Sequence, residues 1–227
     1  NFSKVRISNC LIANNTTTTG SSLYGKGAGI YCKSCSPLIK NNHITNNSAQ
    51  IWGGGIFCDD ASPIIKNNLI DQNTAHSGGG ICCVASSSFI SENTIVNNTV
   101  TYGGGGLFCY GSSNNITIFN NIISDNTCIG GIGGGIQCNS SPALIENNII
   151  NNNNCNASNG RGGGVACVSS TAMIKNNTIN NNYATYSGGG IVSEWSDNSD
   201  IINNIITNNS AGVIGGDGIS IYTNGNM

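Results

Sequence analysis

The sequence predicts an all-β solenoid, a parallel β-helix of about eight coils, from three observations. A glycine run followed by an aliphatic residue recurs along the 227 residues. These aliphatic residues are Ile30, Ile56, Ile81, Leu107, Ile136, Val165, Ile191 and Ile219, and their successive numbers differ by 25 to 29. That period is typical of solenoids. Between the runs, short segments alternate apolar with polar residues and end at asparagine pairs, which indicates strands and turns rather than helices.

The repeat from Gly53 to Asn73 shows how one coil is built. Ile56 and Cys58 alternate with polar or outward residues, and two further apolar positions follow at Ile65 and Ile70. We therefore expect three short strands per coil, with the stretch from Asn73 to the next glycines acting as a turn. Each strand pairs with its counterpart in the next coil, so coils rise by about 4.8 Å.

Asparagine pairs recur at two turns of the repeat. Asparagine tolerates the left-handed backbone that a tight corner needs, and stacked amide side chains can hydrogen-bond along a column. We expect two asparagine ladders that border one strand. The first contains Asn41-Asn42, Asn67-Asn68, Asn120-Asn121, Asn147-Asn148, Asn176-Asn177 and Asn203-Asn204; the second contains Asn46-Asn47, Asn73, Asn97-Asn98, Asn126, Asn152-Asn153, Asn181-Asn182 and Asn208-Asn209.

With its GGGI signature, this pattern resembles the right-handed parallel β-helix repeats of the pectate-lyase-like superfamily, and the glycine runs are similar to those of polymorphic outer-membrane proteins and many bacterial surface proteins. The resemblance implies a right-handed coil over nearly the whole chain. It specifies activity poorly, because that superfamily includes polysaccharide lyases, hydrolases, tailspikes and adhesins. No coil matches the catalytic motifs of those enzymes, so the resemblance assigns no catalytic residue.

The composition limits the classes of partner that this chain could bind. Charged residues make up 8% of the chain and the net charge is −2, so a basic nucleic-acid surface is not expected. No stretch has the 18 apolar residues of a membrane span. The repeat runs from end to end, which predicts one domain over residues 1–227. Its first residue is Asn1 and neither end shows a cap, so we expect a fragment or subunit whose ends contact the rest of a longer surface protein or stack head to tail on another copy.

Six cysteines lie two residues after the coil aliphatic and should face inward as a column: Cys32, Cys58, Cys83, Cys109, Cys138 and Cys167. Metal binding and redox chemistry are alternatives, but cysteine acting as a small buried hydrophobe is the favoured interpretation. Cys32 and Cys35 also have the spacing of half a zinc or redox site, without a second pair. Outward neighbours of the column, Tyr31, Phe57, Cys82 and Phe108, form an apolar stripe that could bind a partner or be covered by a loop.

Cys128 and Cys155 occupy equivalent places in two adjacent coils whose loops are longer than the others. They are the best candidates for a disulfide, which would indicate an oxidising, extracellular setting.

Large side chains stand just before the glycine runs: Tyr24, Trp52, His76, Tyr102, Arg161 and Tyr186. Stacked coils would place them along one edge, where aromatic faces could pack on the rings of a polysaccharide. The alternative is that they only cover the glycine turn.

An acidic patch is the candidate metal site. Glu194, Asp197 and Asp200 cluster near one turn without a matching lysine or arginine, and Ca²⁺ is the metal that such a patch would suit. We expect no other cofactor.

These observations favour a non-catalytic extracellular or cell-surface solenoid with a structural or adhesive role, whose open ends could associate end to end into filaments. A polysaccharide-binding or polysaccharide-degrading lyase or hydrolase is the alternative; it would need carboxylates and a basic residue converging on one face. Ice binding ranks last, because the threonine columns are interrupted by aliphatic residues.

Overall fold

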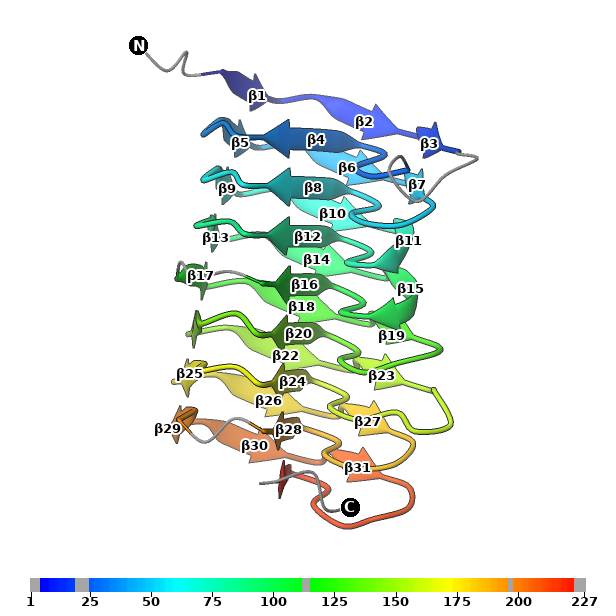
Figure 1. The fold of residues 1–227 in the computed structure, drawn as a ribbon, viewed down its shortest axis with the longest axis vertical. Helices are drawn as coiled ribbons and strands as arrows, with labels where there is room; N and C mark the ends of the chain where they lie inside the picture. The colour runs from blue at the N-terminus through cyan, green and yellow to red at the C-terminus, as the bar shows by residue number, and fades with distance from the viewer. Residues whose placement is uncertain (1–4, 19–24, 112–114, 196–197, 223–227) are drawn as a thin grey trace.

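The computed structural model describes residues 5–18, 25–111, 115–195 and 198–222. Over these residues the chain winds into a rod of stacked coils, with the sequence running along the long axis (Figure 1). Strands pair in parallel with the equivalent strand of the next coil, so four long sheets line the sides of the rod. The prediction of an all-β parallel β-helix is confirmed.

Sheet A is the first that each coil enters. Its strands are β1 (Arg6–Ser8), β5 (Leu38–Lys40), β9 (Ile64–Lys66), β13 (Phe89–Ser91), β17 (Ile116–Phe119), β21 (Ala143–Glu146), β25 (Met173–Lys175) and β29 (Asp200–Ile202). Sheet B follows after one asparagine corner. Its strands are β2 (Leu11–Ala13), β6 (His43–Thr45), β10 (Leu69–Asp71), β14 (Thr94–Val96), β18 (Ile122–Ser124), β22 (Ile149–Asn151), β26 (Thr178–Asn180) and β30 (Ile205–Thr207).

Sheet C corrects the expectation of three strands per coil. It lies after the second asparagine corner, in the stretch expected to be a turn, and its strands are β3 (Thr16–Thr17), β7 (Ser48–Ala49), β11 (Thr74–Ser77), β15 (Thr99–Gly103), β19 (Thr127–Cys128), β23 (Asn154–Cys155), β27 (Tyr183–Ala184) and β31 (Ser210–Ala211). Most of these strands have two residues, too few to show an alternating pattern. The six strands from β7 to β27 each place one small side chain, such as Ala49 or Val100, in a separate buried cluster.

Sheet D closes the coil. Its strands are β4 (Ile30–Lys33), β8 (Ile56–Asp59), β12 (Ile81–Val84), β16 (Leu107–Tyr110), β20 (Ile136–Asn139), β24 (Val165–Val168), β28 (Ile191–Glu194) and β32 (Ile219–Tyr222). The six cysteines of the expected inward column lie here, all buried and paired in register with one another. The hydrogen bond of Cys167 to Cys138, together with burial, holds the pKa of Cys167 well above its ordinary value, so this thiol stays protonated.

The two asparagine ladders are confirmed, and each asparagine of a pair has its own role. At the second corner, Asn97 takes the left-handed backbone with φ 57° and faces solvent, whereas Asn98 is buried. Asn98 accepts hydrogen bonds at Oδ1 from the backbone N–H and Nδ2 of Asn73 at 3.0 and 3.1 Å. Its own Nδ2 donates to the carbonyl oxygen of Ile70 at 3.0 Å and to Asn126 at 3.0 Å. Every amide in the interior of the column thus satisfies a backbone group of the preceding coil.

The glycine run makes the corner between sheets C and D. Gly53 has φ 67°, and a Cβ there would lie 2.6 Å from the Cβ of Phe57. A Cβ on Gly55 would lie 2.6 Å from the carbonyl oxygen of Gly80 in the next coil. Glycine is therefore required because the chain turns sharply here and packs closely on itself.

Candidate functional site

The segment before each glycine run folds over the outer face of sheet D. Short parallel bridges join these segments from coil to coil, linking Lys26 to Trp52, Trp52 to Ser77, and further on Ile132 to Arg161. We call this stack the loop ridge: residues 25–26, 51–52, 76–77, 102–103, 131–132, 160–161 and 186–187.

The ridge covers much of the outward apolar stripe. Phe57, Cys82 and Phe108 are buried although they point away from the core, and they form a small cluster with Trp52 packed against it. The rings of Trp52 and Phe57 lie 5.7 Å apart at an angle of 42°. Burial accordingly raises the pKa of Cys82 well above its ordinary value. Of the two fates expected for this stripe, a covering loop is the one found for these three residues, and Tyr31 remains exposed.

One cleft has a volume of about 330 Å³ and is lined by Trp52, His76, Ser77, Tyr102, Phe108, Tyr110 and Asn139. The rings of His76 and Tyr102 stack with centroids 5.2 Å apart and planes 12° from parallel. Phe108 and Tyr110 stack at 6.0 Å and 13°. Tyr102 and Tyr110 stay 48% and 42% exposed, so each stacked pair contributes an exposed tyrosine to the cleft.

The charged side chains near the first coils of this face contact other side chains of the protein. The Lys26 ammonium lies 4.7 Å from the ring centre of Trp52, a cation–π contact. Asp59 accepts a hydrogen bond from the Tyr31 hydroxyl at 3.0 Å and pairs with Lys33 at 3.6 Å. Partial burial and the neighbouring Asp59 together raise the pKa of Tyr31.

A second, smaller cleft of about 240 Å³ lies beside the long loops, and Tyr102 lines both clefts. Arg161 lines this second cleft and pairs with Glu194, Nη1 to Oε1 2.6 Å. Glu194 is only 1% exposed, on the outer side of β28. Burial raises the pKa of Glu194, and the Arg161 guanidinium counteracts part of that rise.

The structure brings together three of the expected sugar-binding residues. Trp52, His76 and Tyr102 line one cleft, whereas Tyr186 is half-buried and is not among its lining residues. Tyr24 lies outside the described residues. Tyr110 and Asn139 were not anticipated as lining residues. The alternation within β16 and β20 could have indicated them, because both lie two residues after an outward position of sheet D.

The expected acidic site is divided between two sheets. Glu194 lies on sheet D and is paired with Arg161, whereas Asp200 lies exposed on sheet A; Asp197 is outside the described residues. The interpretation that this patch has no matching cation is wrong for Glu194, because Arg161 reaches it from the preceding coil. Across the described part of the chain, histidine, cysteine and acidic side chains form no group of three that could hold a metal ion.

The expected disulfide is not formed. Cys128 and Cys155 are adjacent in register on sheet C, buried, and both are free thiols. Each thiol donates instead to a carbonyl oxygen of the covering loop, Cys128 to Tyr102 and Cys155 to Gly131, both at 3.1 Å. In-register neighbours of a parallel sheet point their Cβ atoms in the same direction, which suits a disulfide poorly. Cys35 is likewise a free, exposed thiol.

Comparison with known proteins identifies a family. A family model described as a right handed beta helix region matches residues 1–118 and 90–227, two overlapping stretches that together span the chain. Searches of curated proteins and of solved structures found no match. The described residues contain no helix that is long and apolar enough to cross a membrane.

Proposed function

Because this chain belongs to the right-handed β-helix family, we propose that it is a non-catalytic, extracellular adhesive rod that binds a polysaccharide in the aromatic cleft beside sheet D. The observation that carries the proposal is the pair of ring stacks in one cleft, His76 with Tyr102 and Phe108 with Tyr110, each of which includes an exposed tyrosine.

The chemistry of the cleft suits a sugar. Carbohydrate rings have apolar C–H faces that pack on flat aromatic side chains, and their hydroxyls need hydrogen-bonding partners at the edges. Tyr102 and Tyr110 offer the exposed faces, while Asn139, Ser77 and His76 bring amide, hydroxyl and imidazole groups to the same cleft. The residues that line this cleft include no carboxylate, lysine or arginine, so an uncharged glycan is the ligand class that it fits.

Binding can be measured with the purified chain and a panel of neutral polysaccharides, by affinity electrophoresis and then calorimetry. We expect Tyr102→Ala and Tyr110→Ala each to weaken binding about tenfold or more, because aromatic anchors dominate such contacts. The matched control is Tyr183→Ala on sheet C, where the tyrosine is 38% exposed and is not among the residues that line the cleft. Equal binding by all three variants, or no binding by the parent chain, would reject the proposal.

The degradative alternative predicts a different outcome. A lyase or hydrolase would shorten the polysaccharide and release new chain ends, so the same mixtures should be followed for reducing sugar and for unsaturated products. The adhesive proposal predicts that the bound polymer keeps its length. Shortening that Tyr102→Ala abolishes would favour the enzyme.

End-to-end stacking is a second proposal, and the exposed core positions of the outermost described coils favour it. Ile219 and Ile221 occupy inward positions of sheet D but are exposed on β32. A further coil, from another copy or from a longer chain, would bury them as it buries Ile191. Electron microscopy over a concentration series tests self-stacking, which predicts filaments one rod wide; discrete rods at all concentrations would oppose it.

A further inference from the structure

One outward position of sheet A forms a continuous strip along the rod. Six in-register residues make its centre: Leu38, Ile64, Phe89, Thr117, Leu144 and Met173. Arg6 continues the same column at one end and Asp200 at the other. We call this column the sheet A strip. Five of its six central residues are apolar, and the two ends carry opposite charges.

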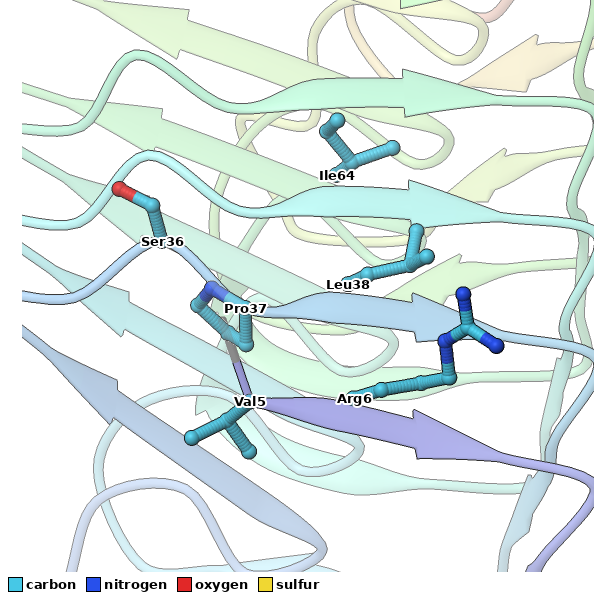
Figure 2. A pocket seen from close by; sticks show the side chains of 6 residues that line it. All are labelled: Val5, Arg6, Ser36, Pro37, Leu38 and Ile64. Carbon is cyan, nitrogen blue, oxygen red and sulfur yellow. The ribbon is translucent and has the colours of Figure 1, made fainter. Parts of the chain in front are cut away.

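The strip is accessible. Ile64, Phe89 and Met173 are exposed although they are large and apolar. At its Arg6 end the strip borders a cleft of about 360 Å³ lined by Val5, Ser36 and Pro37 as well as strip residues. Figure 2 shows Arg6, Leu38 and Ile64 one above the other on successive strands, with Val5 and Pro37 beside them.

The order of residues in the strip is self-complementary. We propose that two copies of this chain pair side by side and antiparallel through the sheet A strip, around a two-fold axis between β13 and β17. In that arrangement Arg6 faces Asp200 of the partner subunit, Leu38 faces the partner's Met173, Ile64 faces the partner's Leu144, and Phe89 faces the partner's Thr117. A two-fold interface uses the same patch twice, so each of these contacts occurs twice.

The second outward column of sheet A is compatible with this pairing. Lys66 lies opposite the partner's Glu146, which is attractive. Lys40 lies opposite the partner's Lys175, but Lys175 is paired with Glu146 within its own chain at 3.4 Å. Lys66 is paired with Glu92 at 2.9 Å, so the flank presents ion pairs rather than a single sign of charge.

The size of the strip sets the expected strength. Eight strands give seven spacings of about 4.8 Å, so the strip is about 34 Å long, and three-residue strands make it about 10 Å wide. This is about 340 Å² of face per copy, below the total of about 1,200 Å² that stable specific interfaces bury, so we expect only a weak, reversible dimer. A parallel pairing would place Arg6 against the partner's Arg6 and is disfavoured by charge.

Sedimentation velocity over a concentration range of about 1 to 500 µM tests the proposal. The parent chain should shift from monomer to dimer within this range. Ile64→Lys should weaken the dimer about tenfold or more, since each variant dimer places two lysines against apolar partners. The matched control is Ile122→Lys on sheet B, where the exposure is 43% against 46% for Ile64; it should dimerise like the parent.

A charge exchange tests the antiparallel register. Arg6→Asp places two aspartates together, and Asp200→Arg places two arginines together, so each single variant should dimerise more weakly at low salt. The double variant restores opposite charges and should recover parental dimerisation. Thermal unfolding of each variant at monomeric concentration checks that the fold is unchanged.

The proposal is overturned by a parent chain that stays monomeric throughout the range. It is also overturned if Ile122→Lys disrupts as much as Ile64→Lys, or if the double variant is no better than the single ones. Assembly only into end-to-end filaments would place the contact at the coil ends and reject the strip as the interface.

Discussion

The two faces of sheet D differ in how they vary from coil to coil. On the inner face, an aliphatic residue and a cysteine recur from β4 to β24. On the outer face, the residue between them changes from aromatic to polar to small: Tyr31, Phe57, Cys82, Phe108, Gln137, Ala166 and Val192. Both faces are largely buried. The inner face is covered by the neighbouring sheets, whereas the outer face is covered by the loop ridge.

The inner face of sheet D stabilises the rod, whereas the outer face gives each coil its own surface. Inside, each residue packs on the same residue one coil above and below, so a change of size disturbs two contacts at once. Outside, loops of different length can adapt to the residue beneath them. The cleft and the buried Arg161–Glu194 pair both lie on this outer face, where variation is tolerated.

The largest predicted effect comes from a charge on the inner face. Cys109→Asp should lower the free energy of unfolding by about 4 kcal/mol or more, because Cys109 is fully buried in the hydrophobic core and a carboxylate there would lose its solvation. Urea unfolding followed by circular dichroism measures it. The control is Tyr110→Asp, one residue along and facing the cleft, which should cost less than about 1 kcal/mol. If the two variants were equally stable, the inward assignment of Cys109 would be wrong.

The next effect concerns the ion pair of the outer face. Arg161→Met leaves the buried Glu194 without its cation and should lower the free energy of unfolding by about 2 kcal/mol or more, since an uncompensated buried charge is costly. The same unfolding assay applies. The control is Lys33→Met, whose exposed pair with Asp59 should be worth less than about 1 kcal/mol. A small loss for Arg161→Met would mean that Glu194 is stabilised mainly by other groups.

A smaller effect should appear as a pH dependence. Because the pKa of Glu194 is raised in the folded chain, the folded state binds more protons than the unfolded state above the ordinary pKa of glutamate, about 4.3. The contribution of Glu194 to stability is therefore fully present below that pH and declines as the pH rises through the raised pKa. Unfolding midpoints measured from about pH 4 to 8 should fall less steeply with rising pH in Glu194→Gln than in the parent. Parallel profiles would contradict this assignment.

The smallest effect is expected in the cleft itself. Tyr102→Ala should change the free energy of unfolding by less than about 1 kcal/mol, because nearly half of this residue is exposed and its ring stacks on the exposed His76. A thermal melt compared with the parent is sufficient. A large loss of stability would show that Tyr102 helps to hold the loop ridge in place. Weaker glycan binding by this variant could then result from a disturbed fold rather than from the loss of a direct contact.

Periodicity made most of the fold predictable. The glycine runs set the repeat, and the asparagine pairs marked two corners because a ladder needs the same residue in every coil. The fourth sheet could not be predicted, since two-residue strands such as β7 and β19 carry no alternation. The spacing of residues within one repeat also could not show that Ile132 and Arg161, in adjacent coils, would form a parallel β-bridge.

The candidate site was predictable only in part. Trp52, His76 and Tyr102 share a place in the repeat, so stacking the coils brings them together. The pairing of Arg161 with Glu194 depends on a loop whose path the repeat does not specify, and the two residues are far apart in sequence. The prediction of a disulfide between Cys128 and Cys155 was wrong, although the two residues are neighbours. They are in register on parallel strands, where the Cβ atoms point in the same direction, and both remain free thiols.

The asparagine columns have a consequence for how such a chain can change length during evolution. The Oδ1 atom of each interior asparagine accepts hydrogen bonds from the preceding coil, and its Nδ2 group donates a hydrogen bond to the asparagine of the following coil. Every coil therefore has the same donors and acceptors at its two faces. Duplication or loss of one whole repeat in the gene would therefore leave no buried amide unsatisfied at the junction. Unequal recombination between repeats can adjust the reach of the rod without redesigning its interior, whereas a change of a few residues within an asparagine corner cannot.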